Sequence, residues 1–255
     1  MRPTFCLRRA ALLGCLALLA PAVQADEALL AVAANFTEVA QRLAQAFGQQ
    51  GDTQVTVTSG STGKLYAQIM HGAPFDLLLA ADEKRPRLLE ANGRAVPGSF
   101  RVYAEGKLAL WSADPARIRG DAASALRGAS FRRLAIANPE LAPYGLAAKQ
   151  TLTALGLWDE VAARIVMGEN IGQTHALVAT GNAELGFVAL SYVLSPANGE
   201  RGSYWEVPGT LHAPIRQALV LLRHGEENRA ARAFLGFLES DAARSIIESY
   251  GYGAG

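Results

Sequence analysis

The feature that most constrains the fold is a regular alternation between short apolar segments and segments with helical periodicity. Leu29–Ala34 is apolar throughout, and the residues that follow recur at helical spacing up to Phe47. Val55 and Val57 begin a second such unit, and further strands are predicted at 76–81, 107–111, 133–137, 164–168, 184–190 and 215–222. Helices are predicted after most of these strands and at 226–238 and 241–249. This alternation predicts an α/β protein with mostly parallel sheets whose two faces are covered by helices.

The first 25 residues are typical of an export signal. Three arginines (Arg2, Arg8 and Arg9) precede an apolar core, and "AVQA" follows Pro21. We predict a secretory signal peptide over residues 1–25. Lipid attachment at Cys15 in "LLGC" and twin-arginine export are weaker alternatives.

Composition limits the kinds of partner. Both cysteines, Cys6 and Cys15, lie in the leader, so the mature chain has no disulfide framework. Loss of the three leader arginines changes the formal charge from +1 to about −2. No basic surface remains to attract nucleic acid, so a bound anion must be held by local donors. The four histidines show no metal-ligand spacing.

Four predicted junctions between a strand and a helix carry small or polar residues. They are "AANF" with Asn35, "GSTG" with Ser61 and Thr62, "APYG" with Tyr144, and "ENIGQ" with Ile171. Ligands of open α/β sheets bind at the carboxyl ends of strands, where such junctions lie. Asn35 is expected to cap its helix or to donate its side-chain amide to a ligand. The hydroxyls of Ser61 and Thr62 and the first-turn amides of Tyr144 and Ile171 are further donors, although a purely structural role also explains each junction taken alone.

The stretch Gly60–Lys64 looks like a nucleotide-binding loop but lacks its pattern. That loop needs a glycine five positions before Gly63, where Thr58 stands, and a hydroxyl after Lys64, where Leu65 stands. Lys64 is therefore expected to be a solvated surface charge. No Gly-x-Ser-x-Gly elbow is present, so an ester hydrolase that uses Ser61 or Thr62 as nucleophile is a minor alternative.

Six motifs in this order resemble one known family. They are "AVAANF", "GSTGKLYAQI", "GAPFDLLLAAD", "NPELAPYGLAA", "GENIGQ" and "ELGFVALS", and together they resemble the periplasmic molybdate-binding proteins of molybdate ABC transporters. The resemblance covers nearly the whole mature chain, up to "YGY" near residue 250. It implies a two-lobed periplasmic binding fold of type II, in which each lobe is a mainly parallel sheet flanked by helices and the ligand lies in the cleft. Residues 26–104 with 213–255 would form lobe 1, and 105–212 would form lobe 2.

The resemblance also implies a set of ligand contacts. Lobe 1 would supply Asn35, Ser61 and Thr62, and lobe 2 would supply the backbone amides of Tyr144 and Ile171. Several family members have a hydroxyl donor where this chain has Ala34, and a tyrosine where it has Ala189. A contact at Ala34 is thus a possible addition, and Tyr192 is not expected to replace the missing tyrosine. Because backbone amides survive side-chain substitution, Tyr144→Phe is expected to be nearly silent.

The function that the resemblance implies is capture of molybdate, and also tungstate, in the periplasm and delivery to an ABC permease. Such a protein is a monomer, is not an enzyme and has no cofactor; the only metal is that of the oxyanion. Molybdate is a tetrahedral dianion without protons, so its site should offer donors only, and the nearby Glu169 should point away. A site for sulfate or another oxyanion on the same fold remains an alternative.

Overall fold

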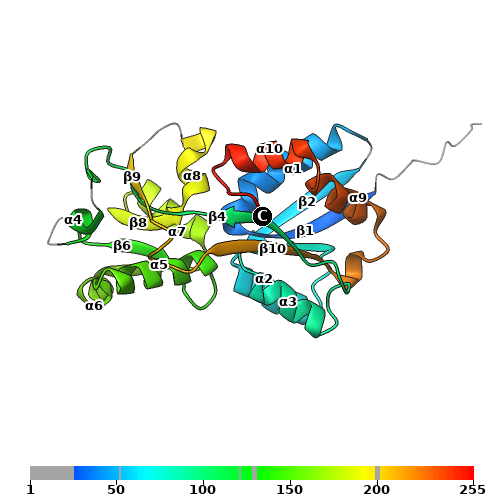
Figure 1. The fold of residues 1–255 in the computed structure, drawn as a ribbon, viewed down its shortest axis with the longest axis horizontal. Helices are drawn as coiled ribbons and strands as arrows, with labels where there is room; N and C mark the ends of the chain where they lie inside the picture. The colour runs from blue at the N-terminus through cyan, green and yellow to red at the C-terminus, as the bar shows by residue number, and fades with distance from the viewer. Residues whose placement is uncertain (1–25, 52, 121, 128–130, 199–201) are drawn as a thin grey trace, which may run out of the picture.

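The computed structural model describes residues 26–255 except 52, 121, 128–130 and 199–201 (Figure 1). The predicted signal peptide, with Cys15, lies outside the described residues. Two five-stranded sheets lie side by side along the long axis of the molecule, and helices cover both faces of each. None of the helices in the described part of the chain has the length and apolar character needed to cross a membrane.

The first sheet has the strand order β2-β1-β3-β10-β4. Its strands are β1 (Glu27–Ala33), β2 (Gln54–Gly60), β3 (Leu77–Leu79), β4 (Arg101–Gly106) and β10 (Ile215–Leu221), and its helices are α1 (Thr37–Gly48), α2 (Thr62–Met70), α3 (Lys84–Ala91), α9 (Arg229–Leu238) and α10 (Asp241–Ser249). Side chains alternate across the sheet. Leu30 and Val32 of β1 pack in the core beneath α1, α9 and α10, whereas Ala31 packs in the core beneath α2 and α3.

The second sheet repeats this plan with the order β7-β6-β8-β5-β9. Its strands are β5 (Leu108–Ser112), β6 (Leu134–Ala137), β7 (Ile165–Gly168), β8 (Leu185–Ala189) and β9 (Ser203–Glu206), and its helices are α4 (Ala122–Leu126), α5 (Pro143–Ala154), α6 (Trp158–Val161), α7 (Ile171–Ala179) and α8 (Leu190–Leu194). Short 3₁₀ turns lie at η1 (Ala34–Phe36), η2 (Ala162–Arg164), η3 (Pro196–Asn198) and η4 (Arg223–Gly225). Leu108 and Leu110 face the core under α5, and Ala109 and Trp111 face α7 and α8.

The chain crosses twice between the sheets, at Lys107 between β4 and β5 and along residues 207–214 between β9 and β10. The predicted two-lobed α/β fold is confirmed, and each sheet is mixed. Strands β1, β2 and β3 pair in parallel, as do β6, β7 and β8, whereas the pairs formed by β10 and β5 are antiparallel. The predicted boundary at 104/105 lies inside β4 and that at 212/213 lies in the second crossover, and both stay a prediction.

Candidate functional site

The four junctions meet at one small cavity between the two sheets. Its volume is about 10 Å³. Its lining includes every residue predicted for the site: Ala34, Asn35, Ser61, Thr62, Tyr144 and Ile171, together with Ala33, Gly60, Ala81, Ala142, Pro143 and Asn170. The residues come from the ends of β1 and β2, the segments that follow β1, β2 and β3, and, on the other side, the starts of α5 and α7. Parallel strands ending at the same edge explain why they converge.

Asn35 differs from the expectation in both of its proposed roles. It lies within η1, and the residue that precedes α1 is Phe36, so Asn35 does not cap that helix. Its side-chain Nδ2 donates to Gln217 Oε1 (2.9 Å) and to Tyr252 Oη (3.0 Å). Both amide protons are thereby used inside the protein. The backbone N–H of Asn35 lies in η1, and the first N–H groups of a helical turn have no partner within it.

Ser61 and Thr62 are buried, and each hydroxyl oxygen accepts a hydrogen bond from the backbone. Ser61 is the N-cap of α2, and its Oγ accepts from the N–H of Lys64 (3.4 Å). Thr62 Oγ1 accepts from the N–H of Ala81 (3.1 Å). A hydroxyl that accepts in this way still has its own proton to donate. Both side chains can therefore hold the turn and bind an anion at the same time.

The second lobe contributes the N-terminal ends of two helices. Helix α5 begins at Pro143, so Tyr144 is its second residue, and α7 begins at Ile171 behind Asn170, which caps it by accepting from the N–H of Gln173 (3.0 Å). First-turn N–H groups lack partners within their helix, and the helix dipole adds partial positive charge. A Cβ at Gly145 would lie 2.2 Å from the carbonyl oxygen of Ala137, which explains the glycine of "APYG".

The rim of the cavity is closed by contacts between the lobes. The N–H of Gly63 donates to the carbonyl of Leu141 (2.8 Å), and Arg85 donates to the carbonyl of Glu140 (2.9 Å). Lys64 Nζ lies 2.6 Å from Glu169 Oε1, with both side chains about half exposed. Lys64 is thus an exposed surface charge, as expected, and its ion pair with Glu169 bridges the lobes. This pair also holds the carboxylate of Glu169 at the rim.

The two positions where this chain departs from the family pattern are Ala34 and Ala189, and Tyr192 bonds to the backbone of the first. Tyr192 Oη donates to the carbonyl of Ala34 across the lobes (2.7 Å), which uses its single proton. Burial raises the pKa of Tyr192 above its usual value near 10, so the phenol stays protonated. Ala189 precedes α8 and is not one of the residues that line the cavity, whereas Ala34 is.

Sequence reasoning missed the buried polar residues behind the cavity. Gln217 of β10 is fully buried and bonds to Asn35, Tyr103 and Tyr144, and Tyr252 donates to the carbonyl of Asn35 (2.8 Å). One signal was available, since Gln217 interrupts the apolar run "IRQALVLL".

The electrostatic character of the cavity is uniform. None of its twelve described lining residues carries a charged side chain, and they include two hydroxyl residues, Ser61 and Thr62, and the first residues of α5 and α7. Such a site suits an anion that needs donors and no acceptor.

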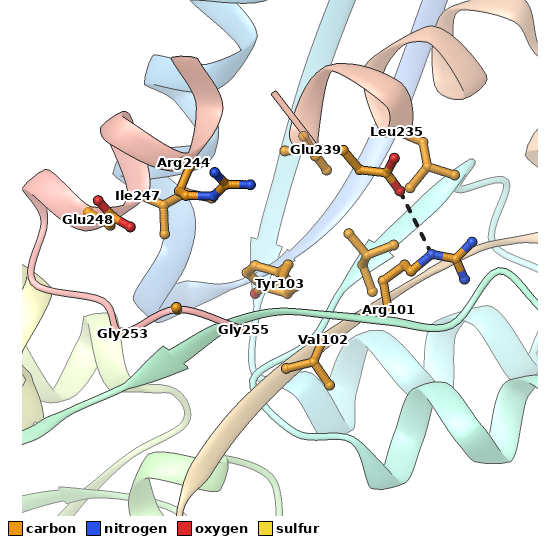
Figure 2. A pocket seen from close by; sticks show the side chains of 13 residues that line it. Arg101, Val102, Tyr103, Leu235, Glu239, Arg244, Ile247, Glu248, Gly253 and Gly255 are labelled. Atoms are coloured by element: carbon orange, nitrogen blue, oxygen red, sulfur yellow. Dashed lines mark ion pairs between the residues drawn. The ribbon is translucent and has the colours of Figure 1, made fainter. Parts of the chain in front are cut away.

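A larger hollow lies elsewhere on the first lobe. It has a volume of about 240 Å³ and is lined by residues of β4, α9, α10 and the C-terminal tail, including Leu235, Arg244 and Ile247 (Figure 2). Arg101 pairs with Glu239 (3.8 Å) at its edge. None of the predicted site residues lines it.

The chain is similar to known extracellular binding proteins over almost its whole length. Residues 28–253 match the family of bacterial extracellular solute-binding proteins. The molybdate-binding protein ModA of Azotobacter vinelandii is 48% identical over 92% of this chain and 93% of that protein. ModA of Rhodobacter capsulatus is 45% identical over 89% of this chain and 88% of that protein.

A solved structure agrees with these relatives. The periplasmic molybdate-binding protein of A. vinelandii matches with a TM-score of 0.86 and 40% identity, over 89% of this chain and 99% of that chain. The resemblance seen in the six motifs and the type II binding fold are thus confirmed. The chain belongs to the bacterial extracellular solute-binding protein family.

Proposed function

We propose that this protein binds molybdate, and also tungstate, in the cavity between its lobes and delivers the anion to an ABC permease. The observation that carries the proposal is the convergence of the four junctions on one cavity that no carboxylate lines. The names of the relatives at 48% and 45% identity support the choice of anion. The predicted signal peptide over 1–25 would export a monomeric receptor to the periplasm.

In this proposal the ligand set is divided between the lobes. Lobe 1 (26–104 with 213–255) supplies the N–H of Asn35 and the hydroxyls of Ser61 and Thr62. Ala34, also of lobe 1, has no side-chain donor. Lobe 2 (105–212) supplies the N–H groups of Tyr144 and Ile171. Five hydrogen bonds to a charged ligand at about 1.5–3 kcal/mol each total roughly 8–15 kcal/mol before costs. After desolvation and loss of ligand freedom, a micromolar to nanomolar Kd is expected.

A competition titration tests the choice of anion. Tryptophan fluorescence of the mature protein is followed while molybdate is added in the presence of excess sulfate or phosphate. We expect sulfate and phosphate not to compete, because neither occupies the site to a comparable extent. The apparent Kd for molybdate should therefore be almost unchanged. A Kd for molybdate that rises in proportion to sulfate would favour a sulfate site on the same fold.

We also propose that the protein is not an enzyme. A serine or threonine nucleophile needs a base that takes its proton. Within the described part of the chain, the partners of the Ser61 and Thr62 oxygens are backbone N–H groups, which cannot do so. Turnover of a chromogenic phosphate or sulfate ester that disappears in Ser61→Ala would contradict this.

A further inference from the structure

The cavity rests on a hydrogen-bonded network whose centre is Gln217. This residue belongs to β10 of the first sheet, and its side chain is fully buried. Its Oε1 accepts from Asn35 Nδ2 (2.9 Å) and from Tyr103 Oη (3.0 Å). Its Nε2 donates to Tyr144 Oη (3.1 Å), which belongs to the other lobe. A buried amide with both ends paired costs little, whereas one deprived of a partner is strongly unfavourable.

The two partners at opposite ends of this amide are themselves candidate ligand residues. Asn35 presents its N–H from the turn after β1, and Tyr144 presents its N–H from the first turn of α5. Both residues line the cavity, whereas Gln217 does not. One side chain outside the cavity thus bonds to a candidate ligand residue from each lobe.

The crossover between the lobes is shaped around the same bond. Gly106 ends β4, immediately before the chain enters the second sheet. A Cβ at this position would lie 2.1 Å from Tyr144 Oη and 2.5 Å from Gln217 Nε2. Only glycine leaves room for the hydrogen bond, so the backbone at the crossover and the bond between the lobes fit each other.

We propose that Gln217 is a positioning residue that couples lobe closure to anion binding through its hydrogen bond to Tyr144. This inference rests on the proposed function, since it concerns the same cavity. In the closed form the bond fixes α5 against β10 and directs the N–H of Tyr144 toward the anion held by the Asn35 turn. Because the bond joins the lobes, it contributes to the free energy of the closed, liganded form and not to that of the open form.

A double-mutant cycle tests the coupling. Wild type, Gln217→Met, Tyr144→Phe and the double variant are each titrated with molybdate, and each is also melted without ligand. We expect each single substitution to raise Kd roughly tenfold, as for loss of a buried hydrogen bond. The double variant should have a Kd no higher than that of the single variant that binds less tightly. The shifts in the ligand-free Tm should simply add. Thr151→Val is the matched control. It removes a buried hydrogen bond within α5, from Thr151 Oγ1 to the carbonyl of Ala147, which lies away from the cavity. The Kd of this variant should equal that of wild type.

The outcomes separate the two claims. Wild type that fails to bind molybdate contradicts the proposed function. If wild type binds molybdate but Gln217→Met and Tyr144→Phe each have a Kd close to that of wild type, the role of Gln217 is overturned. It is also overturned if the effects of the two substitutions on Kd multiply in the double variant. If Gln217→Met does not fold, Tyr144→Phe alone decides, since an unchanged Kd in that variant is sufficient to reject the coupling.

Discussion

The side chains of Ser61 and Thr62 show that capping a helix and binding an anion are compatible roles. From the sequence alone the two roles were alternatives, because either role accounts for a hydroxyl residue after a strand. The direction of the hydrogen bonds resolves this: each oxygen accepts from a backbone N–H and keeps its proton. The capping bond fixes the side chain, so its proton has a defined direction before a ligand arrives.

Removing these hydroxyls separates stability from binding. Ser61→Ala should weaken molybdate binding by about tenfold and cost only about 0.5–1 kcal/mol of stability, because its capping bond is long. Thr62→Ala should also weaken binding, but should cost about 1–3 kcal/mol of stability because it leaves the buried N–H of Ala81 unpaired. Thr62→Ser keeps the hydroxyl and should approach wild type in both. Calorimetry and urea unfolding measure the two effects, and unchanged affinity in Ser61→Ala would contradict the assigned role.

Tyr144 illustrates where reasoning from the backbone alone is insufficient. Tyr144→Phe looked silent when only its N–H was considered. The structure places its phenol in a buried hydrogen bond with Gln217, and burial raises the pKa of Tyr144 well above its usual value. Loss of the hydroxyl is now expected to weaken binding. The partner lies 73 residues away in sequence, so no local pattern indicated it.

Glu184 provides a pH dependence that should leave the site untouched. Burial by itself raises the pKa of Glu184, but the N–H of Arg133 (2.9 Å) and the side chain of Arg132 (3.0 Å) outweigh it and lower the pKa to about 2. A carboxyl with a lowered folded pKa stabilises the protein above its unfolded pKa of 4.5, and this contribution is lost as the pH falls toward 2. Glu184→Gln should therefore lower stability at pH 6, and the difference from wild type should shrink between pH 4.5 and 2. Urea unfolding across this range measures it; a constant difference would contradict the assignment, and molybdate affinity at pH 7 should be unchanged.

At the scale of elements, the predicted strands were those with continuous apolar sequence. Strands β1, β5, β6, β8 and β10 are buried on both faces, and apolar runs predicted them to within a few residues. Strands β4 and β9 were missed because they are edge strands with exposed polar side chains, as in "RVYAEG". Helix α8 was missed because its first residue continues the apolar run of β8. The exposed connection predicted at 195–203 contains η3 and the first residue of β9, and 199–201 lie outside the described residues.

The first turn of α2 makes a testable contact between elements of the two lobes. Gly63 donates to the carbonyl of Leu141, and a Cβ there would lie 3.0 Å from the Cα and the oxygen of Leu141. Gly63→Ala should stabilise the ligand-free protein by up to about 1 kcal/mol through helix propensity. The same methyl group should hold the lobes apart and raise Kd roughly tenfold.

A matched control exists in α9. Gly236→Ala has open space around the new Cβ, so it should give the same gain in Tm with an unchanged Kd. A Gly63→Ala variant in which stability and affinity for molybdate both rise, or both fall, would contradict a role in closure.

At the scale of the whole molecule, the two lobes meet through many weak contacts around one cavity. The rim pair of Lys64 and Glu169 is half exposed and is worth about 0–1 kcal/mol, so it adjusts closure without driving it. The arrangement of the turns could be predicted because each lies at the end of a parallel strand. The network behind them could not, because Gln217 and Asn35 are 182 residues apart and meet only when the chain has crossed twice between the lobes.

Isothermal titration calorimetry of the mature protein with molybdate tests the central claim most directly. The account predicts one site per chain with a Kd between micromolar and nanomolar, weakened in Ser61→Ala and unchanged in Glu184→Gln. Absence of heat with molybdate, at protein concentrations where sulfate or phosphate does bind, would contradict it.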